Sequence, residues 1–312
     1  MVFLGNDPWS VPPLRALVDA GDVDVSLVVT NPPRPAGRGS RLTPTAVAEA
    51  AREAGLPTIE VEGVRADEGF AALDATQPDA LVVVAYGEIL TPDVLDIPAL
   101  GAVNVHFSLL PRWRGAAPVQ RAILEGDERT GVTVMLMDEG MDTGPILATA
   151  ETAIGPDEDT GSLGARLAEL GAPLLVETLR AFAAGSVRPR PQDHVAATPA
   201  PKPKREERVI DWTARADAIV RRVRAFAPDP GATTTFRGDP LKVLRAGFVT
   251  GWIAAASSDP GRLGVANGGD VVVHAGDGTR VRLREVAAAG RKRMTGAAWA
   301  RGARIRPGER LG

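Results

Sequence analysis

The sequence contains no cysteine, and this absence excludes several kinds of chemistry. Without thiols there are no disulfides, no thiolate-bound metals and no cysteine nucleophile. Histidine is also scarce: only His106, His194 and His274 occur, none close to another, so a metal site is not expected. No apolar run approaches the roughly eighteen residues that a membrane span needs. With no basic leader before Gly5 either, the sequence predicts a cytoplasmic protein without a membrane span.

What the sequence does contain is typical of an ordinary globular protein. Its 312 residues are 44% hydrophobic and 24% charged, which is enough for a buried core and for two domains. The net charge of −3 conceals an uneven distribution. From Lys202 onward there are 22 Lys and Arg but only 11 Asp and Glu, whereas the residues before it contain 14 and 28. A basic C-terminal part favours a polyanionic partner, although a solubilising surface charge explains the same numbers equally well.

The N-terminal half alternates short apolar runs with helical patterns. Strands are expected at Val2–Leu4, Val25–Val29, Leu81–Ala85, Val103–Val105 and Val132–Met137, and helices at Leu14–Ala20, Ala46–Ala54 and Pro118–Leu124. This alternation predicts an α/β fold with a parallel sheet, whose ligands bind beyond the carboxyl ends of the strands. The first turn, Gly5-Asn6-Asp7-Pro8, does not fit the dinucleotide pattern G-x-G-x-x-G. Residues 30–44, with four prolines and three arginines, are expected to form a long loop, and loops of this length are usually functional or disordered.

The C-terminal half changes character after a helix expected at Gly161–Ala184. Residues 186–208 are rich in proline and basic side chains, which predicts a linker between domains at residues 1–185 and 209–312. In the second domain a basic helix at Ala214–Phe226 precedes short β segments at Thr233–Phe236, Lys242–Leu244, Val271–His274 and Arg280–Leu283. This spacing predicts a small β-barrel of the oligonucleotide-binding (OB) kind.

Candidate catalytic residues gather between Gly101 and Gly144. Asn104 and His106 lie two apart at a predicted strand end, so their side chains point to the same face. Asp142 follows the next predicted strand, and adjacent parallel strands would bring both turns to one edge of the sheet. These three residue types suit acyl transfer to an amine. The amide donates a hydrogen bond to the oxygen that becomes charged, the imidazole moves a proton, and the carboxylate orients the imidazole. The alternative is a buried structural histidine beside a turn-forming asparagine.

The same stretch resembles the signature of folate-dependent formyltransferases. The matching residues are Asn104-Val105-His106, Ser108-Leu109-Leu110-Pro111, Arg114-Gly115-Ala116-Ala117-Pro118, the Gly131–Met137 strand and Asp142-Thr143-Gly144. The resemblance implies that Asn104, His106 and Asp142 are catalytic. It also implies a Rossmann-like domain that binds 10-formyltetrahydrofolate as co-substrate, without a metal, through two segments: Ala85, Tyr86, Gly87, Ile89 and Leu90, and Ser108, Leu109, Leu110 and Pro111.

Other segments resemble the branch of this family that acts on methionyl-tRNA. They are the basic loop Pro33–Gly39, the dipeptide Asp211-Trp212 and the run Val223-Arg224-Ala225-Phe226. The resemblance implies a monomer that formylates the α-amino group of methionyl initiator tRNA for translation initiation, with an OB-like C-terminal domain that binds the tRNA. It assigns tRNA contacts to Arg34, Arg38 and Arg41 of the loop and to Lys202, Lys204 and Arg205 of the linker. For the linker residues, an ordinary charged segment is an equal alternative.

Two other functions stay open from the sequence alone. Enzymes that formylate nucleotide amino sugars share the three catalytic residues but not the loop around Arg38. A non-catalytic RNA-binding protein with a folate-sensing first domain is the second alternative, and the intact set of Asn104, His106 and Asp142 argues against it. Comparison of formyl transfer to charged tRNA and to an amino-sugar nucleotide separates the enzymes, and any turnover excludes the sensor.

Overall fold

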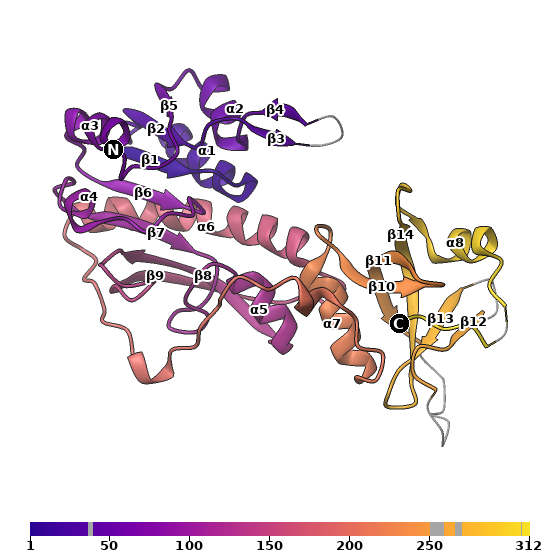
Figure 1. Ribbon diagram of the computed structural model, residues 1–312. Helices are drawn as coiled ribbons and strands as arrows, with labels where there is room; N and C mark the ends of the chain where they lie inside the picture. Colours follow the sequence, from indigo (N-terminus) through magenta and orange to yellow (C-terminus); the bar gives the residue numbers. More distant parts are fainter. Residues whose placement is uncertain (37–39, 250–258, 266–269, 307) are drawn as a thin grey trace. The chain divides into compact units, whose positions relative to one another are not determined.

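The computed structural model describes residues 1–36, 40–249, 259–265, 270–306 and 308–312 (Figure 1). They form two compact units, each of which is described by itself. The first unit comprises residues 1–118, 129–153 and 164–201, and the second comprises residues 119–128, 154–163 and 202–312. Most of the segment expected to be a linker, residues 186–201, therefore belongs to the first unit.

A mixed sheet forms the centre of the first unit. Within the described residues it has seven strands in the order β5-β2-β1-β6-β7-β8-β9. The strands are β1 (Val2–Gly5), β2 (Leu27–Thr30), β5 (Thr58–Glu60), β6 (Leu81–Val84), β7 (Ala102–His106), β8 (Arg129–Leu136) and β9 (Ile146–Ala153). The run from β5 to β7 is parallel, whereas β8 and β9 pair antiparallel with their neighbours. The predicted Rossmann-like α/β fold is confirmed, but the expected parallel pairing of the strands before His106 and Asp142 is wrong.

Helices cover both faces of this sheet. They are η1 (Pro8–Ser10), α1 (Val11–Asp19), α2 (Ala46–Glu53), α3 (Asp67–Thr76), α4 (Pro92–Leu95) and α6 (Thr160–Ala183), and a further 3-10 turn, η2, spans His194–Ala196. Val2 and Leu4 pack with Leu73 of α3 on one face, whereas Phe3, between them, points to the other face and is equally buried. Such strands are apolar at every position because a parallel sheet is covered on both sides.

The proline-rich segment at residues 30–44 is more regular than the sequence predicted. It carries a two-stranded antiparallel hairpin of β3 (Arg34–Ala36) and β4 (Arg41–Thr43). Pro35 is tolerated there because this pair is isolated from the main sheet, and a strand with a free edge does not need every N–H. The proline and glycine content of this segment therefore did not predict its short β-hairpin.

The second unit contains an antiparallel sheet in the order β10-β11-β14-β13-β12, with β15 paired to β14. Its elements are α5 (Pro118–Glu125), η3 (Glu206–Arg208), α7 (Ala216–Phe226), β10 (Ala232–Phe236), β11 (Asp239–Phe248), β12 (Leu263–Val265), β13 (Val271–His274), β14 (Arg280–Ala288), β15 (Met294–Thr295) and α8 (Gly296–Ala303). Helix α7 packs against β11 and β14. The predicted C-terminal β domain is confirmed, and its OB-like topology stays a prediction.

An ion pair within the second unit gives a pH-dependent contribution to stability. Arg121 of α5 contacts Glu207 at two points, Nη1–Oε2 at 2.6 Å and Nη2–Oε1 at 3.1 Å. The hydrogen bond from Arg121 is the largest cause that lowers the pKa of Glu207 below its ordinary value of 4.5. A carboxyl whose pKa is lowered by folding stabilises the native state above its unfolded pKa, and this contribution is lost as the pH falls through the folded pKa.

Glu207→Gln is therefore expected to reduce the free energy of unfolding at neutral pH by about 1 kcal/mol, because the pair is partly exposed. The difference from the unsubstituted protein should shrink as the pH falls below 4.5, where Glu207 in the unfolded chain is already protonated. Denaturant titrations over a series of pH values measure this difference. A deficit that stays constant down to acid pH would mean that the charge of Glu207 is irrelevant.

Candidate functional site

Strand β7 presents two of the expected catalytic side chains on one face. Asn104 and His106 are only 9% and 6% exposed, and they alternate with buried Val103 and Val105, which point to the opposite face. Polar groups in such an environment need partners, because an unpaired buried donor or acceptor is costly. Both side chains find the same partner, the carboxylate of Asp142.

Asp142 reaches them by a different route from the one expected. In the antiparallel register of β7 and β8, Asn104 lies opposite Met135 and His106 lies opposite Thr133. The chain thus leaves β8 near the start of β7, and the loop of residues 137–145 that joins β8 to β9 must fold back to bring Asp142 to His106. Asp142 has a φ of 52°, in the left-handed region that a residue with a side chain rarely adopts.

The geometry gathers the three groups around one carboxylate. Asp142 Oδ1 accepts a hydrogen bond from Asn104 Nδ2 at 3.4 Å, and Oδ2 lies 3.6 Å from His106 Nδ1. The backbone N–H of Gly115 donates to Oδ2 at 2.8 Å. Asp142 is 17% exposed, so the carboxylate is held in place yet still reaches solvent. A side-chain amide, an imidazole and a carboxylate arranged in this way are able to stabilise charge on oxygen and to move a proton.

A backbone carbonyl determines which nitrogen of His106 carries the proton. His106 Nε2 lies 2.9 Å from the carbonyl oxygen of Trp113, and a carbonyl only accepts hydrogen bonds, so Nε2 is the protonated nitrogen. Nδ1, which faces Asp142, is therefore the atom with a free lone pair in the neutral ring. The sequence did not reveal this assignment, because it depends on a carbonyl seven residues away along the chain.

The segment after β7 is fixed by hydrogen bonds to β8. Thr133 Oγ1 donates to the carbonyl of Ser108 and accepts from the N–H of Leu110. The hydroxyl of Ser108 donates to the carbonyl of Arg112 at 2.7 Å, and Ser108 itself is fully buried. Of the four residues expected to contact folate here, Ser108 and Leu110 are buried, whereas Leu109 and Pro111 are partly accessible.

The segment after β6 leaves the sheet at the same edge as His106, because β6 and β7 are parallel neighbours. Tyr86 and Leu90 are buried, whereas Ile89 is 57% exposed. Gly87 has a φ of 87°, and apart from its two chain neighbours no heavy atom of the described residues lies within 4 Å of the position that a Cβ would occupy. Burial and the nearby Glu88 carboxylate raise the pKa of Tyr86. This strand end therefore offers exposed backbone and an apolar side chain beside the catalytic candidates.

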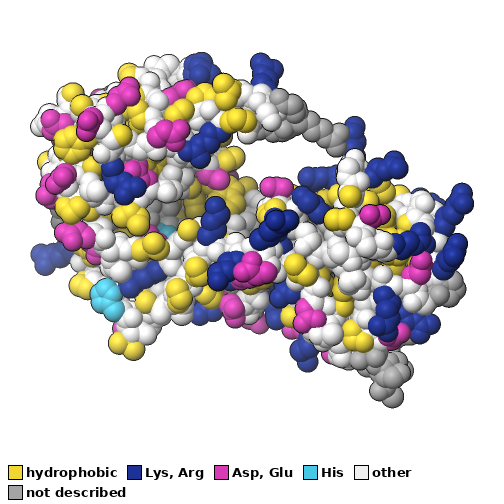
Figure 2. Space-filling model, viewed as in Figure 1, with side chains coloured by type: hydrophobic (Ala, Val, Ile, Leu, Met, Phe, Trp, Pro, Cys, Tyr) yellow, Lys and Arg dark blue, Asp and Glu magenta, His cyan; other side chains and the backbone are white. Residues whose placement is uncertain are grey.

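The basic residues assigned to tRNA contacts lie at the surface. Arg34 of β3 is exposed and pairs with Glu62 at 2.9 Å, and Arg41 of β4 is also exposed. Arg38 lies outside the described residues. In the second unit Lys202, Lys204 and Arg205 are exposed, and Figure 2 shows further Lys and Arg side chains across the visible face of that unit.

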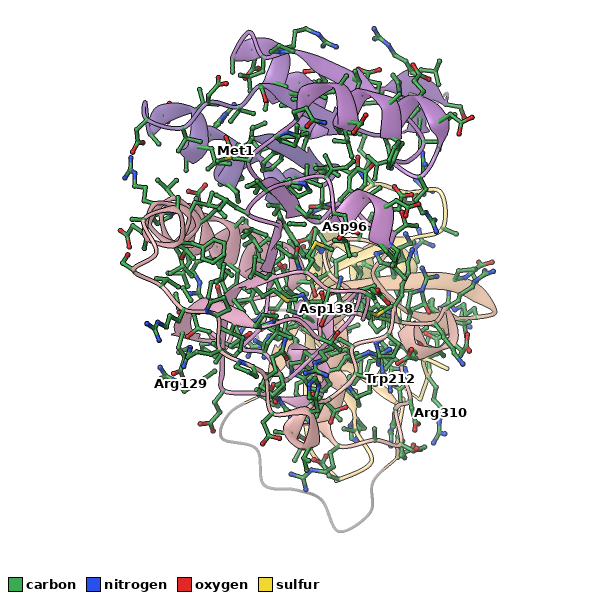
Figure 3. All side chains as sticks on the ribbon, turned by 90° about the vertical axis from the view of Figure 1, so that its left-hand side faces the viewer. Met1, Asp96, Arg129, Asp138, Trp212 and Arg310 are labelled. Carbon is green, nitrogen blue, oxygen red and sulfur yellow. The ribbon has the colours of Figure 1, made fainter. Side chains whose placement is uncertain are left out.

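The sequence did not identify two residues of the segment 190–200 whose hydrogen bonds support the site. Gln192 donates to the carbonyl of Asp142, and Thr198 accepts from the N–H of Trp113. Nothing in the composition marks them, since both lie in a stretch that reads as a linker. The loop that carries Asp142 also contains Asp138, which is labelled in Figure 3 and accepts hydrogen bonds from Gly140 and Thr143.

The described part of the chain contains neither a cluster of metal ligands nor a membrane-spanning helix. No group of three or more His, Asp or Glu side chains there is placed to hold a metal ion. No helix among the same residues has the length and apolar character that crossing a membrane requires.

Comparisons with known proteins match both halves of the chain. A family model described as formyl transferase matches residues 2–179, and one described as the formyl transferase C-terminal domain matches residues 202–304. A relative from Roseiflexus sp. (strain RS-1) named methionyl-tRNA formyltransferase is 46% identical, over 100% of this chain and 95% of its own. Further relatives with that name are 43–47% identical over 99–100% of this chain.

Solved structures show the same fold at much lower sequence identity. A variant of HypX from Aquifex aeolicus superposes with a TM-score of 0.69 at 17% identity, covering 99% of this chain and 48% of HypX, so this chain spans about half the length of HypX. WlaRD, a sugar 3N-formyl transferase solved with dTDP and 5-N-formyl-THF, superposes with a TM-score of 0.66 at 15% identity, covering 93% of this chain and 98% of WlaRD. At these identities the likeness shows the fold alone.

Proposed function

The chain belongs to the formyl transferase family, and from that membership we propose that it transfers the formyl group of 10-formyltetrahydrofolate to the α-amino group of methionyl initiator tRNA. One observation carries the choice of substrate: relatives named methionyl-tRNA formyltransferase are 43–47% identical over the whole chain, including its basic C-terminal unit. The product is the formylated aminoacyl-tRNA used in translation initiation.

The residues at the carboxyl edge of β6 and β7 fit a flat heterocyclic co-substrate. We assign its binding to Ala85, Tyr86, Gly87, Ile89 and Leu90, and to Ser108, Leu109, Leu110 and Pro111. The open space beside Gly87 and the exposed side chain of Ile89 support this assignment, since a planar ring needs close approach to backbone and an apolar surface. When bound, 10-formyltetrahydrofolate supplies the formyl group that is transferred. The chain's own residues supply the rest of the chemistry.

We assign the chemical step to Asn104, His106 and Asp142. As the amine adds to the formyl carbon, negative charge grows on the formyl oxygen, and the second N–H of the Asn104 amide is free to donate to it; one such donor is typically worth about 100- to 1000-fold in rate. Nδ1 of His106 accepts the proton that the attacking amine loses. The carboxylate of Asp142, 3.6 Å away, stabilises the imidazolium that results. The imidazolium of His106 would then return this proton to N10 of the folate as the bond from N10 to the formyl carbon breaks, so that neutral tetrahydrofolate leaves and the ring is neutral again.

We assign the contacts with tRNA to Arg34, Arg38 and Arg41 in the first unit and to Lys202, Lys204 and Arg205 in the second. Every one of these residues that the structure describes is exposed. This exposure supports the role, since a phosphate contact needs an accessible cation. We further propose a monomer in the cytoplasm, where charged tRNA is found, with domains at residues 1–185 and 209–312. Residues 186–208 join the two domains in sequence, and residues 186–201 of this segment pack within the first unit. The matched family regions at residues 2–179 and 202–304 support this division.

Binding of tRNA is expected to weaken steeply with added salt, because each side chain that docks on a phosphate displaces a counterion. If Lys202, Lys204 and Arg205 each contact one phosphate, together they account for roughly a 20- to 40-fold loss of affinity between about 50 and 200 mM salt, the lower figure for a single strand and the higher one for a duplex. Replacing all three with glutamine should remove that part of the salt dependence in a fluorescence titration. Arg15→Gln, at an exposed arginine of α1, is the control, and an unchanged slope in the triple variant would contradict the assignment.

The proposed function is tested by offering the purified protein two acceptors. With 10-formyltetrahydrofolate present, we expect formylation of methionyl-tRNA and none of a nucleotide-linked amino sugar. Transfer to the amino sugar alone would assign the chain to another branch of the family. Binding of folate and tRNA without any turnover would identify a non-catalytic sensor.

A further inference from the structure

Residues 190–200, here called the strap, bind both loops that face His106. At one end Arg190 exchanges two backbone hydrogen bonds of 2.8 Å with Ile146, the first residue of β9. At the other end the N–H of Ala200 donates to the carbonyl of Arg114 at 2.6 Å, and its carbonyl accepts from Ala117. The strap lies entirely in the first unit and joins the loop that carries Asp142 to the loop after β7.

Gln192 is the side chain through which the strap reaches the Asp142 loop. It is 6% exposed, and its Nε2 donates to the carbonyls of Asp142 and Gly144 at 2.9 and 2.7 Å. Its Oε1 accepts from Nε and Nη2 of Arg114 at 3.1 and 2.7 Å. A guanidinium only donates and a carbonyl only accepts, so the orientation of the amide is unambiguous. All four of its hydrogen bonds are to protein, which leaves none for a ligand.

This contact acts on a residue whose backbone has an unfavourable conformation. Asp142 has a left-handed φ of 52°, which persists only where the surrounding structure imposes it. The hydrogen bonds of Asp138 with Gly140 and Thr143 are internal to the loop and do not tie it to β7. The Asp142 carboxylate is bonded to Asn104 and to the N–H of Gly115, but these bonds hold the side chain and not the backbone. The bond from Gln192 to the Asp142 carbonyl holds the backbone, through Arg114, against the loop that follows β7.

The strap also holds the second partner of His106. Thr198 Oγ1 accepts from the N–H of Trp113 at 2.9 Å, and the carbonyl of Trp113 is the group bonded to His106 Nε2. Trp113 likewise has a left-handed φ, of 67°. One segment thus restrains the groups on both sides of the imidazole ring.

We propose that Gln192 is a positioning residue for formyl transfer, which holds the Asp142 loop against Arg114 so that the carboxylate faces Nδ1 of His106. This inference rests on the proposed function, because it assigns a role within that reaction. Without the Gln192 amide, the Asp142 carbonyl loses its donor and the backbone relaxes. The carboxylate then shifts away from the imidazole, although Asn104 and Gly115 still contact it. Gln192 touches none of the residues assigned to folate or tRNA, so the substrates should bind as before.

The test compares Gln192→Leu and Gln192→Glu with Val195→Ser, a control in the same strap whose side chain is 96% exposed. Gln192→Leu keeps the volume and removes every hydrogen bond. In Gln192→Glu the carboxylate still accepts from Arg114, but its second oxygen faces the carbonyls of Asp142 and Gly144, to which it cannot donate. The activity of this variant should therefore be as low as that of the leucine variant. For both, kcat is expected to fall roughly 100-fold, the usual effect of a misplacement of about 1 Å, with KM for both substrates nearly unchanged.

A second readout does not depend on activity. Hydrogen exchange of the peptide covering residues 137–146, measured by mass spectrometry, should be faster in both Gln192 variants and unchanged in Val195→Ser. Normal kcat with normal exchange in the variants would overturn the inference, and so would a rise in KM that accounts for the whole loss. If the unsubstituted protein fails to formylate methionyl-tRNA, the proposed function is contradicted instead. Hydrogen exchange of the peptide at residues 137–146 would then still show whether Gln192 restrains the loop.

Discussion

Replacing His106 with alanine is expected to lower kcat for formyl transfer by about 100- to 10 000-fold, the usual contribution of a positioned general base. The substitution removes Nδ1, the atom with a free lone pair beside Asp142, and no other imidazole in the described first unit approaches this carboxylate. Steady-state kinetics with methionyl-tRNA measure the loss. The KM for each substrate should change little, because the ring acts on the proton rather than on binding.

The control for this experiment is His274→Ala, which removes a half-buried histidine of the second unit. It should keep nearly full activity. Thermal unfolding of both variants separates a catalytic role from a structural one, since His106 is 6% exposed and its loss also leaves the Trp113 carbonyl without this partner. If His106→Ala loses its fold as fully as its activity, the histidine is structural.

Asp142→Asn is expected to reduce kcat by about 100-fold or more, although it only removes the negative charge and replaces one carboxylate oxygen with an NH2 group. The asparagine keeps an oxygen for the N–H of Gly115, so the loop should stay in place. That oxygen also faces Nδ1 of His106, but the neutral amide no longer stabilises an imidazolium. Its NH2 group replaces the oxygen that accepts from Asn104, so that hydrogen bond is lost as well. A pH series of kcat should show no pH at which the activity recovers.

The matched control is Asp138→Asn, in the same loop. Asp138 is exposed and accepts from Gly140 and Thr143 through one oxygen, which an asparagine retains. This variant should keep its activity to within about twofold, as is usual for conservative surface substitutions. Equal losses in the two variants would show that the loop tolerates no change, and the role assigned to the Asp142 carboxylate would be lost.

The sequence predicted the position of Asn104 and His106 well because the two-residue period of a strand is a local property. It failed on the direction of β8. A helix between two strands is typical of the crossover that joins parallel strands, and helix α5 lies between β7 and β8 in the sequence. The apolar pattern of a strand does not indicate whether it pairs parallel or antiparallel with its neighbour. Strand β9 was missed altogether, since the run Ile146–Ala153 is rich in alanine and threonine and exposes alternate residues. Asp142 therefore reaches His106 by folding back and not by sharing a strand edge.

The supporting residues lay beyond what a single sequence reveals. Gln192 contacts Asp142 across 50 positions, and Thr198 contacts Trp113 across 85. Their surroundings are rich in proline and charge, a composition that usually indicates a linker. Only tertiary contacts show that residues 190–200 belong to the site, whereas the motif residues around them could be found by their chemistry alone.

The most direct test of the account is a crystal structure of the protein with 5-formyltetrahydrofolate, a formyl-bearing analogue of the co-substrate. We expect the formyl group beside the ends of β6 and β7, with its oxygen within hydrogen-bond reach of Asn104 Nδ2. The side chains of His106 and Asp142 should flank it as they do now. A formyl group bound away from these three residues would contradict the central claim.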